Sequence, residues 1–462
     1  MWSITTGKIS LTKFRSDILI VLFSVLFVSI HPDARGQQNL LSDSATIKDC
    51  LKYAFRNQPL IKQLKLDEGI TKENIRIALA DWLPQINASA NLQHYLEQPK
   101  LLFPDITNPS GPKILIQSGV LYNSGITLSA SQNIFNADVY IAGRTARTYR
   151  LQSAQTSRSA VIEMVVEISK AFYDVLLSEE QLNLINEQIT RLNKSLKDAY
   201  THFQNGTNDM IDYKRATISL NNAMAQKKSA LESINAKTSY LKQLMGYPGD
   251  KVLNLTSNIR SLEKEILLDT LQYLDVNNRI EYQLLQTNLR LQKSRIDYYR
   301  FGMLPSLTAF ANYNYVYQND QFSDLYKTYY PNSTIGLSLT LPIFQGTKRL
   351  QNIRKSKMEY ERLALDTIRT RNEMNTQYVS AMASYKSNLD LYNATSRNSE
   401  IAREVYNTVK LQYDQGVKSY LEVIVSETDL MSARINNLNA LFMLMFSKLD
   451  VQRASGSISV DY

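Results

Sequence analysis

The sequence predicts an α+β membrane protein in which transmembrane β-strands, four per chain, adjoin very long coiled-coil helices. Three observations lead to this fold class. One order of motifs occurs twice, about 210 residues apart. Two intervals of more than sixty residues lack both glycine and proline, and four short stretches alternate apolar with polar residues. Such strands are typical of a membrane barrel with a watery interior.

The duplication predicts a chain built from two internal repeats. Residues 203–206 (Phe-Gln-Asn-Gly) match residues 413–416 (Tyr-Asp-Gln-Gly), and the match runs on without a gap to Gly246 and Gly456. A period of this length is far beyond that of solenoid repeats, which is roughly 20 to 50 residues. The predicted divisions are a first repeat at 37–246, an inter-repeat linker at 247–264, a second repeat at 265–456 and a C-terminal tail at 457–462.

Each repeat is expected to contain a long helical hairpin. Residues 144–205 and 347–415 contain neither glycine nor proline, so each interval can run as one helix of roughly 90 to 105 Å. Apolar residues spaced three and four apart predict a buried seam of coiled-coil type. The hairpins are placed at about 137–244 and about 346–454, with tips at Gly206 and Gly416. The seam of the first comprises Val161, Val165, Ile168, Phe172, Val175, Leu182, Ile185, Ile189, Leu192, Leu196, Ala199 and Phe203.

Each repeat also contains two stretches with a period of two, which predict strand pairs at about 84–132 and about 305–343. Only Phe310 and Val316 break the alternation in the second pair. A soluble antiparallel sheet with one face on a core would show the same pattern. The export signal described below favours the membrane interpretation. The connections at 96–117 and 318–332 are interpreted as exposed loops outside the cell.

Residues 1–36 have the features of a secretory signal peptide. Lys8, Lys13 and Arg15 precede an apolar run from residue 18 to residue 30, and Ala34-Arg35-Gly36 supplies small residues for cleavage. The alternative is a membrane anchor, but the run is shorter than the roughly 20 residues that a spanning helix needs.

Composition and motifs argue against several other functions. The formal net charge is +9, but lysine and arginine are dispersed among acidic and amide residues, so nucleic-acid binding is not predicted. Cys50 is the only cysteine, and His94 and His202 stand apart from any cysteine or histidine cluster, so neither a metal site nor a disulfide is predicted. No cofactor is expected, and no catalytic motif indicates an enzyme.

Four strands are too few to close a membrane barrel, so the chain is expected to oligomerise. The order of motifs resembles the TolC-type outer-membrane efflux family over nearly the whole chain after the signal peptide. The matching segments are residues 46–59, Leu83-Pro84, Leu304-Pro305, residues 341–346 and both tips. The resemblance implies a homotrimer in which a β-barrel joins a helical barrel in the periplasm.

The resemblance also implies the function. Such a trimer is an outer-membrane exit duct of a tripartite efflux or type I secretion system. It conducts substrates passively while an inner-membrane transporter supplies energy through a periplasmic adaptor protein. Outer-membrane lipid would surround the strands.

The resemblance implies a gate at the periplasmic entrance. Its residues here would be Asp212, Tyr413, Lys418 and Glu422, with Asp212 able to pair with Lys418. The sequence departs from the family pattern at Val425, where a second acidic residue is often found.

The tips would dock onto the adaptor through Gly206, Thr207, Gly416 and Val417. The alternative is that each glycine serves only the turn between two helices, where it suits a left-handed conformation. Both explanations can hold together.

Two other classes of protein share some of these features. One is a secreted trimeric coiled-coil stalk or adhesin without transport, which would not carry strand pairs between its helices. The other is a soluble helical scaffold that bends membranes or binds nucleic acid. The cargo of a duct is not readable from the sequence.

Overall fold

A computed structural model describes residues 44–104, 111–206, 209–256, 266–269 and 273–460. These residues belong to one compact unit, Asp43–Tyr462. The predicted signal peptide lies outside the described residues, as do residues 257–264 of the predicted linker and the last two residues of the tail.

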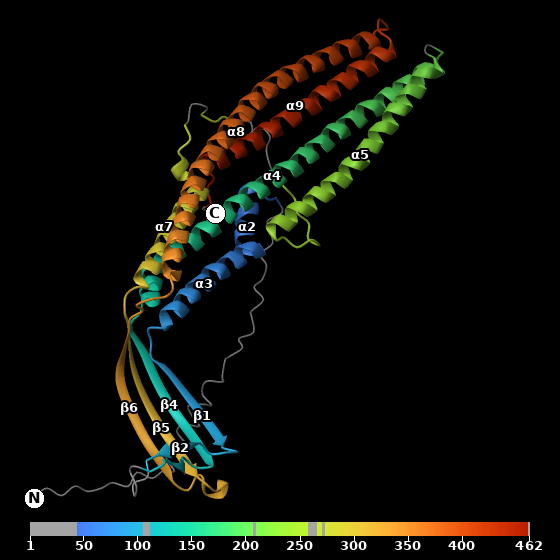
Figure 1. Cartoon of the computed structure of the whole chain (residues 1–462). Helices are drawn as coiled ribbons and strands as arrows, with labels where there is room; N and C mark the ends of the chain where they lie inside the picture. The colour runs from blue at the N-terminus through green and yellow to red at the C-terminus, as the bar shows by residue number, and fades with distance from the viewer. Residues whose placement is uncertain (1–43, 105–110, 207–208, 257–265, 270–272, 461–462) are drawn as a thin grey trace, which may run out of the picture. The chain divides into compact units, whose positions relative to one another are not determined.

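The described elements occur in the same order in the two halves of the chain. One helix, two long strands, a very long helix and a shorter helix follow one another twice, as α3-β1-β4-α4-α5 and α7-β5-β6-α8-α9. Figure 1 shows the strands at one end of the helices. The bounds are α2 (Ile47–Asn57), α3 (Pro59–Ala80), β1 (Gln85–His94), β2 (Lys100–Phe103), β3 (Ile114–Gln117), β4 (Tyr122–Phe135), α4 (Ala137–Gln204), α5 (Met210–Met245), η1 (Val276–Asn278), α7 (Ile280–Phe301), β5 (Ser306–Asn319), η2 (Phe322–Asp324), β6 (Tyr329–Thr340), α8 (Lys348–Asp414) and α9 (Tyr420–Ser455).

The four long strands form one antiparallel sheet in the order β1-β4-β5-β6. Their register brings the apolar residues of all four strands onto one face. Ala88 lies opposite Leu128, Leu128 opposite Tyr313, and Ala311 opposite Ile335. The polar partners Asn87, Ser129, Asn312 and Thr334 lie across the sheet from one another in the alternate row. The sheet therefore has one apolar face and one face of small polar side chains.

The register accounts for one break in the alternation. Phe310 falls in a row of the polar face, and its partner across the strands is Gly336. A Cβ at Gly336 would lie only 2.7 Å from the Phe310 ring. The ring therefore occupies the space that the missing side chain leaves.

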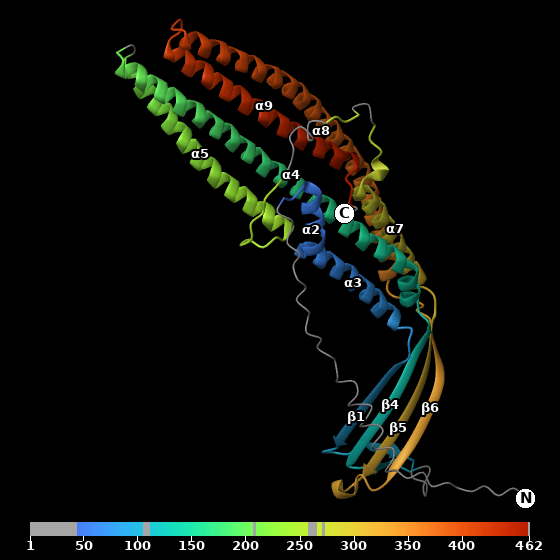
Figure 2. The same cartoon turned by 180° about the vertical axis from the view of Figure 1, so that it is seen from behind.

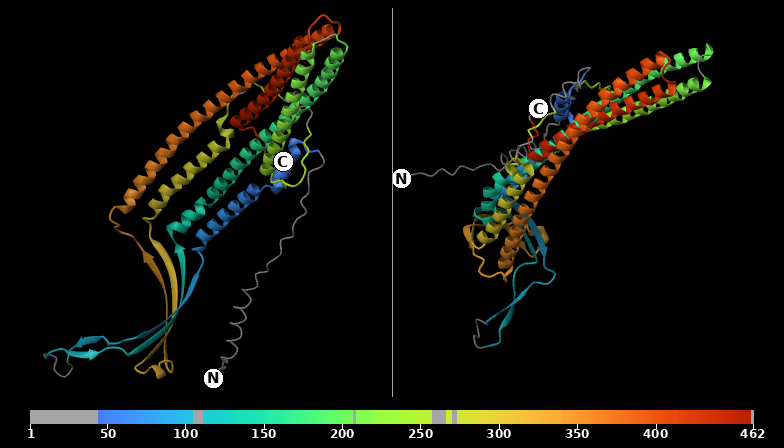
Figure 3. Two further views of the ribbon diagram at one scale, coloured as in Figure 1. Left: turned by 90° about the vertical axis from the view of Figure 1, so that its right-hand side faces the viewer. Right: turned by 90° about the horizontal axis from the view of Figure 1, so that it is seen from above.

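The loop predicted at 96–117 contains regular structure, which corrects that prediction in part. β2 and β3 form a separate two-stranded antiparallel sheet in which residues 101–103 pair with residues 114–116. Both segments are runs of large apolar residues, and such runs favour strands even in a connection rich in proline. Figure 3 shows this small hairpin beyond the end of the four-stranded sheet.

The two very long helices cover nearly all of the intervals without glycine and proline, and α4 begins earlier, at Ala137, so that Gly143 lies inside it. α4 has 68 residues and α8 has 67. Most of the predicted seam of α4 is buried, including Ile168, Phe172 and Val175. Phe203 is an exception, because at 37% exposure it lies at the open end of the hairpin. Among the residues that the structure describes, no helix combines the length and apolar character needed to cross a membrane.

α5 and α9 each end in a glycine that is packed against the backbone of another segment. Gly246 and Gly456 are left-handed, with φ of +67° and +76°. A Cβ at Gly456 would lie 2.8 Å from the carbonyl oxygen of Asn278, and one at Gly246 would lie 3.0 Å from the Cα of Gln58. Both positions therefore require glycine for conformation and for space.

We expect Gly456→Ala to destabilise the protein by more than the roughly 1 to 2 kcal/mol cost of a left-handed alanine, because the backbone of Asn278 must also move. The measurement is the apparent melting temperature of the purified protein in detergent. Gly69→Ala is the matched control, since Gly69 lies inside α3 with open space around it and alanine favours helix there. Equal melting temperatures for the two variants would contradict this account of the α9 terminus.

Candidate functional site

The candidate site is the end of the two long hairpins farthest from the sheet. We call α4 with α5 the first hairpin and α8 with α9 the second hairpin; Figure 2 shows their tips side by side. Gly206 and Gly416 are left-handed, with φ of +67° and +77°, and no atom crowds either one. Asp209 caps α5, and Ser419 caps α9 in a reciprocal capping box with Glu422. Each tip thus has a sharply defined helix start and end.

A buried cluster just behind the tips joins the two hairpins. Its side chains come from all four helices, so the tips are packed on one another within one chain. The Tyr413 and Tyr420 ring centroids lie 5.7 Å apart, and His202 presents its ring edge-on to Tyr413 at 6.4 Å. This tip cluster comprises Ala199, Ala216, Tyr406, Tyr413, Tyr420, Val423 and Leu430.

Lys410 is a tip residue that the sequence did not single out. Its ammonium group lies 2.7 Å from Asp414 in its own helix and 3.8 Å from Asp198 in α4. It also lies 5.0 Å from the centre of the Tyr413 ring. The side chain is only 18% exposed, so this cation connects the second hairpin to the first beside the predicted gate tyrosine.

Three predicted gate residues lie at or just before the starts of α5 and α9, and the fourth, Tyr413, lies near the end of α8. Lys418 Nζ lies 2.7 Å from Glu422 Oε1, and the other carboxylate oxygen accepts from the Ser419 backbone at 2.9 Å. The hydrogen bond from Lys418, followed by that from the Ser419 backbone, lowers the pKa of Glu422. Asp212 is half-buried in the first turn of α5. Since the structure pairs Lys418 with Glu422, a bond from Asp212 to Lys418 stays a prediction.

The predicted docking residues occupy the turns themselves. Val417 is 69% exposed and adjoins Gly416 at the start of the second turn. Gly206 holds the equivalent place in the first turn, and Thr207 lies outside the described residues.

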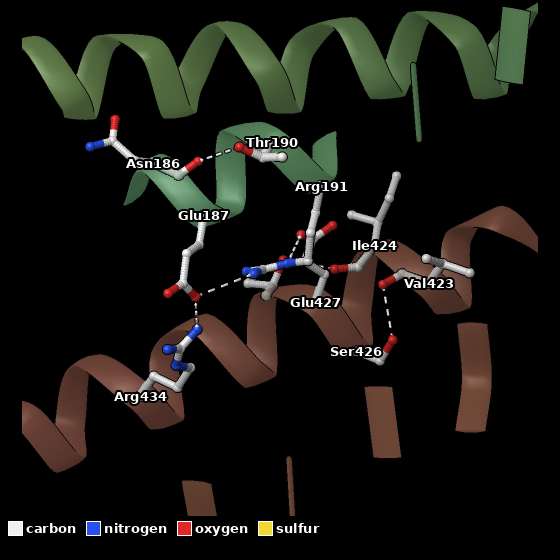
Figure 4. Close-up of polar contacts among 10 residues, drawn as sticks. Asn186, Glu187, Thr190, Arg191, Val423, Ile424, Ser426, Glu427 and Arg434 are labelled. Atoms are coloured by element: carbon white, nitrogen blue, oxygen red, sulfur yellow. Dashed lines mark hydrogen bonds and ion pairs between the residues drawn. The ribbon is translucent and has the colours of Figure 1, made fainter. Parts of the chain in front are cut away.

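A second contact between the two hairpins lies farther from the tips than the tip cluster. Four charged side chains, Glu187 and Arg191 from α4 with Glu427 and Arg434 from α9, form the inter-hairpin ion cluster shown in Figure 4. Arg191 Nε donates to Glu427 Oε1 at 3.0 Å, and Arg434 forms an ion pair with Glu187. The Glu427 side chain is only 4% exposed, whereas Glu187 is 53% exposed. The Arg191–Glu427 pair is therefore the buried half of the cluster.

Burial governs the chemistry of Glu427. Desolvation raises the pKa of its carboxyl group, and the hydrogen bond and charge of Arg191 offset part of that rise. The charge of Lys410, from α8, also lowers the pKa of Glu427. Without Arg191, the ionised carboxylate would lack its main partner in a site that water hardly reaches.

We expect Arg191→Met to destabilise the protein by about 3 kcal/mol near pH 8, because Glu427 is then left charged and buried without its partner. The variant's folded state should bind a proton more tightly than its unfolded state, so the deficit should shrink as the pH falls toward 5. Apparent melting temperatures across that pH range measure both effects.

Arg434→Met is the matched control, since it removes an arginine from the same cluster but affects only the more exposed Glu187, which keeps its 3.8 Å contact with Arg191. Its cost should be below about 1 kcal/mol and nearly independent of pH. A larger loss for Arg434→Met than for Arg191→Met would contradict the assignment of the buried pair.

The described residues contain no group of three or more histidine, cysteine, aspartate or glutamate side chains that could hold a metal ion. Cys50 is buried in α2, and burial raises the pKa of its thiol to about 12. The thiol is therefore protonated at neutral pH and is a poor nucleophile.

Comparison with known proteins gives a consistent picture. The model of the family described as outer membrane efflux protein matches residues 51–247 and 277–456. The chain is 20% identical over 449 residues to the outer membrane protein TolC of Vibrio cholerae, which covers 94% of this chain and 95% of that protein. It is also 20% identical over 433 residues to the proteases secretion protein PrtF of Dickeya chrysanthemi, covering 89% and 88%.

A solved structure shares the fold. The Campylobacter jejuni CmeC outer membrane channel aligns with a TM-score of 0.69 and 16% identity, over 90% of this chain and 87% of that one. At this level of identity the likeness shows the fold alone.

Proposed function

This chain belongs to the outer membrane efflux protein family, and from that premise we propose that it forms the outer-membrane exit duct of a tripartite efflux or type I secretion system. Substrates would pass through it passively from the periplasm or an inner-membrane pump to the exterior. The observation that carries the proposal is the two-faced sheet, whose strands lead into helices of 68 and 67 residues.

The sheet has the chemistry of a barrel wall. Its apolar face carries large exposed side chains such as Ile335, Leu337 and Leu339, at 86%, 67% and 67% exposure. Tyr313, Tyr315 and Tyr317 follow on the same face of β5, toward the strand's outer end, and aromatic residues favour the boundary between lipid and water. The opposite face of serine, threonine and asparagine suits a lumen filled with water.

The sheet edges support assembly. Within the described residues, β1 and β6 each have a single partner strand, so each presents an unpaired row of backbone groups. Lipid does not tolerate such edges, and pairing β1 of one copy with β6 of the next would satisfy them. A homotrimer of the two-repeat chain would then form a twelve-stranded barrel and a twelve-helix tunnel, as the resemblance implies.

The tips would form the periplasmic entrance and dock onto an adaptor protein. Gly206, Thr207, Gly416 and Val417 are the proposed docking residues, and the adaptor would connect the duct to an inner-membrane transporter. The gate would comprise Asp212, Tyr413, Lys418 and Glu422. PrtF is named for protease secretion and the family for efflux, so the chain's own cargo is left open between these classes.

A duct needs no catalytic group, and the relatives named above are channel and secretion proteins. The alternative from another class is a secreted trimeric stalk or adhesin. That function gives no reason for a sheet with a polar face opposite an apolar one.

Reconstitution tests the proposed function. The purified full chain, inserted into planar lipid bilayers, should form discrete conducting channels, and native mass spectrometry in detergent should show three chains per particle. A protein that fails to insert, or that inserts without conductance, would be a stalk rather than a duct.

We expect Lys418→Glu to raise single-channel conductance severalfold, because it places negative charge beside Glu422 and removes the proposed partner of Asp212. Asp212→Asn and Glu422→Gln separate the two contacts. If the bond to Asp212 holds the gate, Asp212→Asn raises conductance as well, whereas if the observed pair holds it, Glu422→Gln does. Lys228→Glu, on the exposed surface of α5, is the control. Unchanged conductance in Lys418→Glu would remove Lys418 from the gate.

A further inference from the structure

Basic residues are concentrated at three of the four helix ends that adjoin the sheet. The first residues of α4 (137–147), the last of α7 (295–301) and the first of α8 (348–354) contain seven arginines and lysines but only two aspartates. The whole chain, by contrast, has 52 basic and 43 acidic residues. Positive charge is therefore concentrated close to the junction between the helices and the sheet. The basic residues of this collar are Arg144, Arg147, Arg295, Arg300, Lys348, Arg349 and Arg354.

Most of the collar lacks an acidic partner. Asp297 is shared, lying 3.9 Å from Arg144 and 3.6 Å from Arg300. The remaining five collar residues make no ion pair with any residue that the structure describes. An anion from outside the chain could therefore bind there without first displacing a carboxylate.

The collar includes a cleft that could hold an anionic group. The cleft has a volume of about 440 Å³ and lies between the start of α4, the end of α7 and the start of α8. Lys348, Arg349, Gln345 and Asn352 line it, and Arg349 is half-buried, with its Nε 3.8 Å from the position that a Cβ of Gly302 would take. Asp138 also lines the cleft, and its hydrogen bond with the Tyr298 hydroxyl raises the pKa of that tyrosine.

A band of exposed apolar residues lies directly on the sheet side of the collar. Each of the four junctions between a helix and a long strand contains two adjacent large apolar side chains, and those after β6 are the most exposed, Ile343 at 91% and Phe344 at 82%. Such side chains are favourable at the boundary between hydrocarbon and headgroups. The pairs are Trp82 with Leu83, Ile134 with Phe135, Met303 with Leu304, and Ile343 with Phe344.

The collar is at headgroup depth if this band marks the edge of the hydrocarbon. Lys348 and Arg349 follow Phe344 by four and five residues, and Arg300 precedes Met303 by three. The chain spans at most about 3.6 Å per residue, so the backbone at Lys348 and Arg300 lies within about 15 Å of the band, a distance that long basic side chains can cover toward the headgroups.

We propose that the cleft binds the headgroup of an anionic glycerophospholipid in the leaflet that faces the periplasm, with Lys348 and Arg349 on the phosphate and Gln345 and Asn352 on the glycerol hydroxyls. The apolar band beside the cleft favours a lipid over a soluble anion, because the acyl chains of a bound lipid would lie along it. This inference rests on the proposed insertion of the sheet into the outer membrane.

The test uses the full chain in nanodiscs of phosphatidylcholine alone or with about 30% phosphatidylglycerol. We expect phosphatidylglycerol to be enriched around the protein after partial delipidation and to raise its apparent melting temperature. Two charges at a membrane surface together favour anionic lipid by roughly tenfold or more, so the double variant Lys348→Gln with Arg349→Gln should lower retention by about that factor.

The control is Lys214→Gln with Arg215→Gln, an adjacent lysine and arginine exposed near the start of α5, at the opposite end of the hairpin. It should retain phosphatidylglycerol like the wild type. Arg349→Lys keeps the charge and should retain most of the lipid, which separates a charge effect from a folding defect. Equal retention by the glutamine double variant and the control would overturn the proposal.

Two further outcomes would also overturn it. Stabilisation of the detergent-solubilised protein by inorganic phosphate, equal to that by phosphatidylglycerol, would assign the cleft to a soluble anion. A shift of channel selectivity toward cations in the double variant, with lipid retention unchanged, would place the collar in the lumen. Failure of the wild type to insert or conduct is a separate result, because it would contradict the proposed duct itself.

Discussion

Backbone hydrogen bonding in the sheet is the constraint on which the rest of the structure depends. Four antiparallel strands satisfy one another internally but leave β1 and β6 with one unpaired side each among the described residues. Because the side-chain period of a strand is two, the register that pairs the strands also separates apolar from polar side chains. In the proposed duct, association of copies and the separation of lipid from water would both follow from this one hydrogen-bond pattern.

The sheet also determines where the helices begin. Only four residues separate α7 from β5, and β4 passes into α4 through the single residue Asn136. The side chain of Asn136 accepts a hydrogen bond from Asp138 and so caps α4. With connections this short, the spacing of the strands is passed on to the helices. Far from the sheet, the tip cluster and the inter-hairpin ion cluster bring the two hairpins together again.

The sequence predicted best those structural features that depend only on residues close to one another along the chain. Intervals without glycine or proline indicate where α4 and α8 run, although α4 also passes through Gly143, and alternation indicates the faces of the strands. The left-handed tip glycines, Gly206 and Gly416, follow from their position after a helical interval. Phe310 broke the alternation, and its reason became visible only with the register, because Gly336 lies on another strand.

Contacts between helices that are far apart in the sequence could not be predicted from the sequence. Arg191 and Glu427 are 236 residues apart, and their meeting depends on the axial stagger of α4 against α9. Lys410 shows both cases: its pair with Asp414 has a helical spacing of four and is readable, whereas its approach to Asp198 is not. The resemblance implies a bond between Lys418 and Asp212, whereas the structure pairs Lys418 with Glu422, four residues farther along the chain.

The unequal lengths of the helices have a mechanical consequence. α4 is accompanied by α3 along one part of its length and by α5 along another, and α8 is accompanied likewise by α7 and α9. Gly246 and Gly456 mark the ends of α5 and α9, where the accompanying helix changes. At that level α4 and α8 continue unbroken, and α2 packs against both α4 and α5. Any bending of a hairpin there must therefore bend α4 or α8 itself, because no loop interrupts either helix.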